Sequence, residues 1–132
     1  MKILLDTHYI LWALSNSDRL SGEDITVISD SKNEIYYSDI SLWEISIKHD
    51  KKPESFAPTA KLIADLCEES GYIELNLRKE HIYNLDLIHS KDKAKYHKDP
   101  FDRILLSQAK TEGMMLLTKD AKLKEYDASL VL

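Results

Sequence analysis

The chain is poor in several residue types that specialised protein classes require. Cys67 is the only cysteine among 132 residues, so an intrachain disulfide is excluded and a reducing cytoplasm is the expected setting. Its place in LIADLCEES predicts a buried helix residue, with a reactive thiol as the alternative. Three glycines are too few for a phosphate-cradling loop, and neither GxGxxG nor GxxxxGK[ST] occurs.

Long apolar runs are also lacking. The first one, residues 3–5, is interrupted by Asp6, and no window approaches the ~20 apolar residues of a membrane span. We therefore expect neither a signal peptide nor a membrane-spanning helix. At this length, with 43% hydrophobic residues, we expect one domain over residues 1–132.

A positive net charge is absent too, since the formal net charge is -5. A protein that held nucleic acid by charge alone would normally be basic. The acidity does not exclude a nucleic-acid substrate, because a metal ion held by carboxylates reverses the local sign of the field.

The hydrophobic pattern predicts strands that alternate with helices, and therefore an α/β fold with a mainly parallel sheet. Expected strands cover residues 3–5, 34–38, 72–77 and 114–118, and residues 129–132 are a candidate edge strand. Expected helices cover residues 7–14, 22–31, 39–48, 59–70, 78–87 and 100–112, with a short turn after Asp120.

Helix boundaries carry recognisable capping residues. Asp6 is placed to cap the first helix, and Asp39 or Ser41 to cap the third. Asp99 and Pro100 have the N-cap and N1 pattern, and Ser21-Gly-Glu-Asp24 has the spacing of a capping box.

Acidic residues in separate segments follow strands or begin helices. They are Asp6, Glu44, the pair Asp99 and Asp102, and Asp120. Parallel sheets place their sites at the carboxyl ends of their strands, so these carboxylates should meet. An oxygen-ligand pocket of this kind suits Mg²⁺ or Mn²⁺ and predicts metal-dependent cleavage of a phosphodiester.

Each acid also has a simpler explanation. Asp6, Asp99 and Asp120 could serve only as helix caps. Glu44 lies in an otherwise apolar helix, so it must face solvent, pair with Lys48 or bind a metal. Capping does not account for the joint arrangement, because clustered carboxylates without a cation would destabilise the fold.

The remaining polar residues are less informative. Thr118 could hydrogen-bond a carboxylate or a metal-bound water, or have a purely structural role. The histidines lack metal-ligand spacing and are interpreted as structural or surface residues (His8, His49, His81 and His89).

At these motifs the chain resembles the PIN-domain nucleases, and specifically the VapC-type toxins of bacterial toxin–antitoxin pairs. The matching segments are LLDTHYILWAL, SDISLWEISIK, HKDPFDRILLSQA and LLTKD, in the family's order over the whole chain. The resemblance implies a three-layer α/β/α sandwich and Mg²⁺- or Mn²⁺-dependent endoribonuclease activity. It also implies a homodimer, an RNA substrate and inhibition by an antitoxin.

Carried over by position, the resemblance implies a catalytic and metal-binding set of Asp6, Glu44, Asp102 and Asp120, with Asp99 and Thr118 as accessory residues. Lys48 and Arg103 are candidates for contact with substrate phosphate. A basic loop is either an RNA rim or a solvated turn (Lys91, Lys93, Lys95, His97 and Lys98). Trp12 and Trp43 either line an antitoxin groove or pack in the core.

Two other classes of function are compatible with an α/β pattern. The first is a phosphotransfer domain that forms an aspartyl phosphate, either a phosphatase or a response-regulator receiver. An aspartyl-phosphate phosphatase needs an acid two residues after its nucleophile, but His8 stands at that place after Asp6. A response-regulator receiver needs an acidic pair after the first strand, and none is evident. A non-enzymatic binding module remains the second alternative and predicts no metal dependence.

Overall fold

A parallel sheet organises the computed structural model, which describes residues 1–55, 58–88 and 99–132. Within these residues the sheet has four strands in the order β3-β2-β1-β4. They are β1 (Lys2–Leu5), β2 (Glu34–Ser38), β3 (Ile73–Leu75) and β4 (Met115–Leu117), and all three neighbouring pairs are parallel. Because the strands run the same way, their carboxyl ends share one edge, as predicted.

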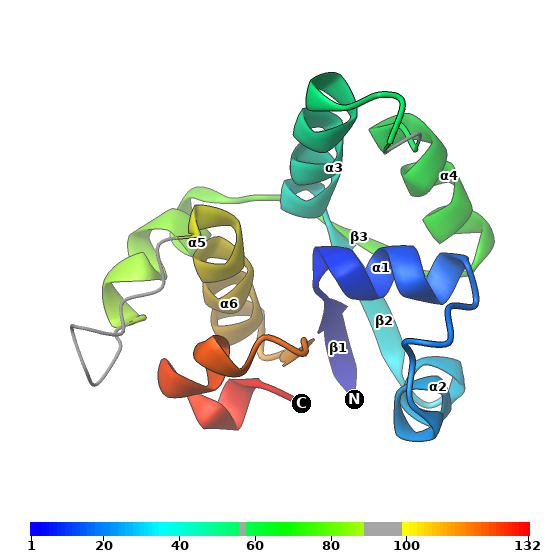
Figure 1. Cartoon of the computed structure of the whole chain (residues 1–132). Coiled ribbons are helices and arrows are strands. Elements are labelled where there is room, and N and C mark those ends of the chain that lie inside the picture. Colours follow the sequence, from blue (N-terminus) through cyan, green and yellow to red (C-terminus); the bar gives the residue numbers. More distant parts are fainter. Residues whose placement is uncertain (56–57, 89–98) are drawn as a thin grey trace.

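Helices connect the strands and cover the sheet (Figure 1). Their bounds are α1 (Thr7–Leu14), α2 (Gly22–Ser29), α3 (Asp39–Lys51), α4 (Ala60–Glu69), α5 (Lys79–Tyr83) and α6 (Pro100–Glu112). Short 3-10 turns are η1 (Asn84–Leu87), η3 (Ala121–Glu125) and η4 (Ala128–Leu130). In the part of the chain that is described, no helix is long and apolar enough to cross a membrane.

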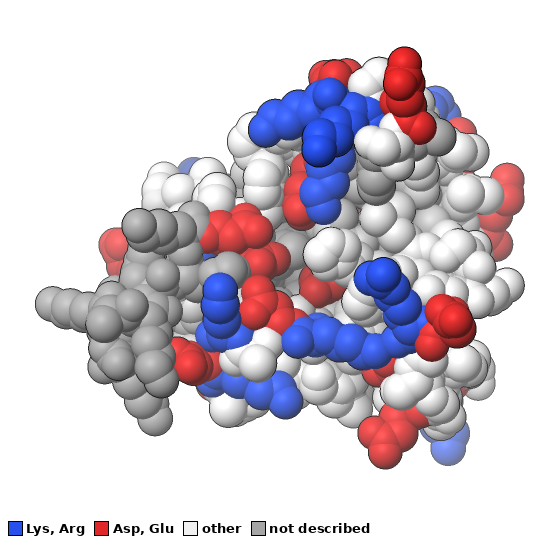
Figure 2. Space-filling view, viewed as in Figure 1, with Lys and Arg blue, Asp and Glu red and all other residues white. Residues whose placement is uncertain are grey.

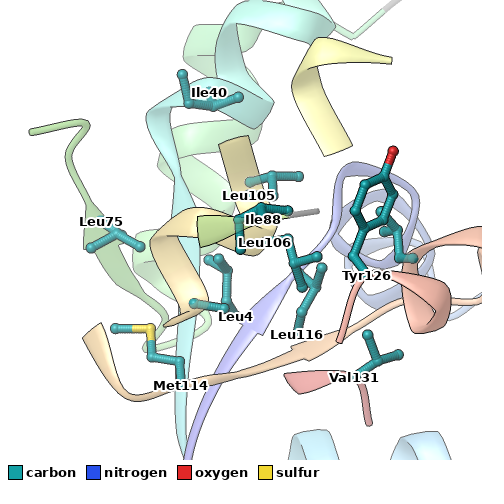
Figure 3. Packing of buried hydrophobic residues seen from close by; sticks show 12 residues of the cluster. Leu4, Ile40, Leu75, Ile88, Leu105, Leu106, Met114, Leu116, Tyr126 and Val131 are labelled. Carbon is teal, nitrogen blue, oxygen red and sulfur yellow. The ribbon is translucent and has the colours of Figure 1, made fainter. Parts of the chain in front are cut away.

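Alternate residues of β1 face two separate cores, which defines the three layers. Leu4 packs with Leu105 and Leu106 of α6 and with Leu116 of β4, and these side chains converge in Figure 3. Side chains of this kind each contribute about 1.5–3 kcal/mol when buried. The sheet therefore lies between helix layers, and the predicted α/β/α sandwich is confirmed.

The other core lies against α1 and α4. Ile3 and Leu5 pack there with Ile10, Ile63 and Cys67. Cys67 is fully buried, and burial raises the pKa of its thiol to about 12. The predicted core position is confirmed, and the reactive-thiol alternative does not fit this environment.

The start of α3 differs from the prediction for a physical reason. Ser38, not Asp39 or Ser41, is the N-cap, and its hydroxyl accepts a hydrogen bond from the Ile40 amide at 3.0 Å. Asp39 is engaged elsewhere, since both its carboxylate oxygens accept from the Leu77 amide at 3.0–3.1 Å. The expected caps of α1, α2 and α6 (Asp6, Ser21 and Asp99) are confirmed.

Other boundaries also shift. The strand expected at residues 72–77 shortens to β3, and the helix expected at 78–87 changes to 3-10 geometry at Asn84. The edge strand expected at residues 129–132 is wrong, because the chain forms η4 and a single bridge from Val131 to Leu116. Tertiary packing rather than periodicity decides these short segments, since β3 packs against β2 and α4, and η1 and η4 pack against α6.

Candidate active site

Asp6 follows β1 directly and is 7% exposed. Its Oδ1 accepts a hydrogen bond from the Tyr9 amide at 2.8 Å, which caps α1, and Thr118 also donates to the carboxylate. Strand register explains this second contact. Leu5 lies opposite Leu117, so the residues that follow them, Asp6 and Thr118, lie side by side. Asp6 is thus both the expected cap and a fixed carboxylate at the sheet edge.

Glu44 is held in place by two different neighbours. The Thr7 hydroxyl donates to its Oε1 at 2.7 Å, and Lys48 Nζ lies 3.2 Å from its Oε2. The Ser41 hydroxyl is 3.0 Å from Thr7 Oγ1 and completes a buried chain of polar groups. The expected pairing with Lys48 is therefore present, but Thr7 also orients Glu44 toward α1.

Asp99 and Asp102 are presented by the first turn of α6. Asp99 is the N-cap, and its Oδ1 accepts from the Phe101 amide at 2.9 Å, while Pro100 occupies N1. Asp102 follows in the first helical turn and is half-buried. Both charges lie at the positive end of the helix dipole, which favours their ionised forms.

Asp120 is the fourth element of the site and follows β4 after two residues. Its side chain accepts from the Lys122 amide at 3.0 Å and caps η3. Its own amide donates to Thr118 Oγ1 at 3.1 Å. Thr118 therefore joins Asp6 to Asp120, which gives the structural role that the sequence left open.

All five of these acids line one pocket of about 400 Å³. The rest of its lining is Thr7, His8, Trp12, Arg19 and Lys119. Figure 2 shows acidic side chains around a hollow near the middle of the face, with basic side chains along its border. The predicted convergence of four separate segments is therefore found in the structure.

Lys48 and Arg103, the two expected substrate contacts, do not line the acidic pocket. Lys48 is paired with Glu44 and lines a neighbouring hollow with Lys51 and Lys52. The Arg103 guanidinium reaches the Ile88 carbonyl at 3.4 Å. The basic loop that includes Lys91, Lys93, Lys95, His97 and Lys98 lies outside the described residues.

The structure adds pocket residues that the sequence did not single out. Thr7 is signalled only by its place after Asp6, and Lys119 only by its place before Asp120. Arg19 lies between two helices and has no sequence signal at all. Trp12 is half-buried in the pocket wall, and Trp43 is 60% exposed, so neither is plain core.

The donor set fits a divalent cation. Carboxylate oxygens are the ligands that Mg²⁺ and Mn²⁺ prefer. In residues 1–55, 58–88 and 99–132 no three His, Cys, Asp or Glu side chains form a ready-made ligand cluster. Mg²⁺ keeps several waters and usually needs only one or two protein carboxylates, so the pocket suits a partly hydrated ion.

The electrostatics of Asp6 point the same way. Burial raises the pKa of its carboxyl, although hydrogen bonds from Thr118 and the Tyr9 amide act to lower it. The nearby Glu44 charge raises it further. A buried carboxylate with a raised pKa is a group that a bound cation would stabilise.

We expect metal-free protein to lose stability as the pH rises through the raised pKa of Asp6. Between the ordinary value of 3.8 and that pKa, the folded state binds more protons than the unfolded state, so the free energy of unfolding falls with pH. Urea unfolding in EDTA across this range measures the effect. The slope should be weaker in Asp6→Asn, and identical pH profiles would contradict the assignment.

Comparisons with known proteins agree with this geometry. A family model described as PIN domain matches residues 3–129. No curated protein sequence matches the chain.

Among solved structures, the chain is similar to the crystal structure of VapBC2 from Rickettsia felis bound to a DNA fragment from their promoter. The TM-score is 0.71 at 17% identity, over 100% of this chain and 97% of that one, which supports the fold. Because the family model spans nearly the whole chain, the protein belongs to the PIN domain family, whose members are nucleases.

Proposed function

We propose that this protein is a metal-dependent endoribonuclease of the VapC type that hydrolyses RNA phosphodiester bonds. The observation that carries the proposal is the pocket in which Asp6, Glu44, Asp99, Asp102 and Asp120 meet at the carboxyl edge of the sheet. So many carboxylates in one hollow are costly for a fold unless they serve a cation.

The proposed roles follow from the position of each acid. Asp6, Asp102 and Asp120 hold Mg²⁺ or Mn²⁺, directly or through water, and Asp99 supports them from the N-cap of α6. The ion, when bound, lowers the pKa of a water molecule and offsets charge that develops on the phosphate. Thr118 keeps Asp6 and Asp120 in register through its two hydrogen bonds.

Glu44 is the proposed group that orients or deprotonates the attacking water. Thr7 fixes one of its oxygens by a hydrogen bond of 2.7 Å, so the carboxylate has a defined direction. Lys48, at 3.2 Å from the other oxygen, balances its charge, and its proposed contact with a substrate phosphate would be made from outside the pocket lining. Arg103 is a weaker candidate for that contact, because its guanidinium is directed to the Ile88 carbonyl.

We also propose that the protein is the toxin of a toxin–antitoxin pair, acts in the cytoplasm as a homodimer and binds a cognate antitoxin. The structural neighbour is described as VapBC2 bound to DNA, which supports an antitoxin partner. An apolar hollow lined by Leu11, Leu14, Leu62 and Leu66 is one place on α1 and α4 that suits such a partner.

Removing the divalent ion should abolish cleavage. We expect purified protein to cut a mixed pool of single-stranded RNA with Mg²⁺ or Mn²⁺ and to be inactive in excess EDTA, because the ion supplies several kcal/mol of charge stabilisation. Gel analysis of the RNA products measures both states, and restoring the ion after EDTA is the control. Cleavage that persists in EDTA would exclude metal-dependent chemistry.

The two rival classes give different results in this experiment. A phosphotransfer domain would form a phosphoaspartate without cutting RNA. A binding module would leave the RNA intact with either ion. Folded, metal-supplied protein that cuts no member of a complex RNA pool would therefore favour these rivals.

A further inference from the structure

The acidic pocket also contains a cation, Arg19, that no carboxylate of the described residues pairs with. Arg19 lines the pocket together with five acids and is exposed to solvent. In the described part of the chain, its guanidinium forms no ion pair, and its one side-chain contact there is with the Trp12 ring, 5.8 Å from Cζ to the ring centroid. Its five N–H donors are therefore available to a ligand.

The Trp12 ring lies within cation–π distance of this guanidinium. His8 stacks on Trp12 with 5.7 Å between ring centroids, and Tyr9 packs edge-on at 5.2 Å, so the indole is held by two neighbours from its own helix. A cation–π contact with an aromatic face reduces the freedom of the guanidinium before a ligand arrives.

Lys119 contacts the backbone of Arg19, although the two residues are 100 positions apart in the sequence. Its ammonium donates to the Arg19 carbonyl, lies 3.7 Å from Asp24 Oδ2 and is 5.3 Å above the Trp12 ring. The Arg19 amide donates to Ser17 Oγ at 3.2 Å. Lys119 therefore links the segment that carries Arg19 to the segment that carries Thr118 and Asp120.

We propose that Arg19 binds a phosphate of the nucleic acid adjacent to the one that is cut, and that Trp12 and Lys119 position it. This inference rests on the proposed function and names a substrate-binding residue of the same pocket. A guanidinium fork matches the non-bridging oxygens of a phosphate, and a chain with a net charge of -5 needs a local cation to hold a polyanion.

Replacing the guanidinium should weaken substrate binding more than it slows the chemical step. Arg19→Ala is expected to raise KM about tenfold with kcat nearly unchanged, the factor for losing one charge-assisted contact of about 1.4 kcal/mol. Arg19→Lys should recover part of the loss, because it keeps the charge but not the fork. Lys32→Ala removes the same charge from an exposed turn and is the matched control.

Binding measured without cleavage separates this inference from the proposed function. In the Asp6→Asn background, fluorescence anisotropy of a short labelled single-stranded oligoribonucleotide should show weaker binding for Arg19→Ala than for Lys32→Ala. The dependence of log K on log salt should fall by about 0.7, the value for one contact to single-stranded nucleic acid. Wild type that cuts RNA while both variants bind equally would overturn the Arg19 proposal alone.

The positioning role of Lys119 is tested by a double-mutant cycle. Lys119→Met should raise KM in the wild-type background but have little further effect when Arg19 is already Ala, because both act on one contact. A purely structural role for Lys119 predicts instead that the two effects add. Additive effects would remove Lys119 from the proposal, and an unchanged KM in both variants would contradict it entirely.

Discussion

Replacing Asp6 with asparagine is expected to abolish RNA cleavage and leave the fold intact. The substitution removes the buried charge at the centre of the carboxylate pocket, where the metal would bind. Loss of about 4 kcal/mol of transition-state stabilisation corresponds to a rate about a thousandfold lower. Steady-state cleavage and thermal unfolding of the two proteins measure the two parts of this prediction.

The fold should survive because asparagine can replace the structural role of Asp6. It is an equally good N-cap, so the hydrogen bond from the Tyr9 amide is retained. It also removes a carboxylate whose pKa is raised by burial, so metal-free Asp6→Asn should be at least as stable as wild type. Asp127→Asn, at the N-cap of η4 outside the pocket, is the matched control and should cleave normally. Full activity in Asp6→Asn would refute the assignment of Asp6.

Truncating Leu105 should have the opposite effect, with low stability and preserved chemistry. Leu105 is fully buried in the core shared by β1, β4 and α6, one turn beyond Asp102. Leu105→Ala leaves a cavity and should lower the free energy of unfolding by about 2–5 kcal/mol, a large part of the ~5–15 kcal/mol typical of a protein. The melting temperature should fall by roughly 10 °C.

Cleavage measured well below that melting temperature should remain near the wild-type rate, because Leu105 does not line the pocket. Leu105→Met nearly conserves the volume and should cost less than about 1.5 kcal/mol, which makes it the matched control. Strong loss of cleavage by a Leu105→Ala protein that is still fully folded would mean that the core positions Asp102 more tightly than the geometry indicates.

Taken together, these variants distinguish a residue that performs chemistry from one that supports it. Asp6 is buried although burial opposes its charge, as expected for a residue retained for function. Leu105 is buried because burial stabilises the fold.

Much of the site was predictable because its acids occupy locally defined positions. Asp99 and Pro100 specify the start of α6 by capping geometry, and Asp6 follows an apolar strand. The parallel-sheet rule then brings these positions to one edge without any knowledge of distances. Thr7 and Lys119 were missed because neither belongs to a recognisable motif of its own. Their only sequence signal is the neighbouring acid, Asp6 or Asp120.

The predictions failed where tertiary contacts override local preference. Asp39 has a good capping side chain, yet it binds the Leu77 amide and leaves the cap to Ser38. For Trp43 the sequence left both the core and an antitoxin groove open, and the structure excludes the core, because the side chain is 60% exposed and packs edge-on against Phe101 at 5.1 Å.

By itself, the sequence determined the parallel α/β pattern, most helix starts and the edge at which the carboxylates gather. These features depend on periodicity and on hydrogen bonds between near neighbours, which short segments encode. Only the tertiary structure decided that Lys119 holds Arg19, a partner 100 residues away, against Trp12. Such a contact depends on how separate layers pack, and no local pattern specifies which charges then lie close together.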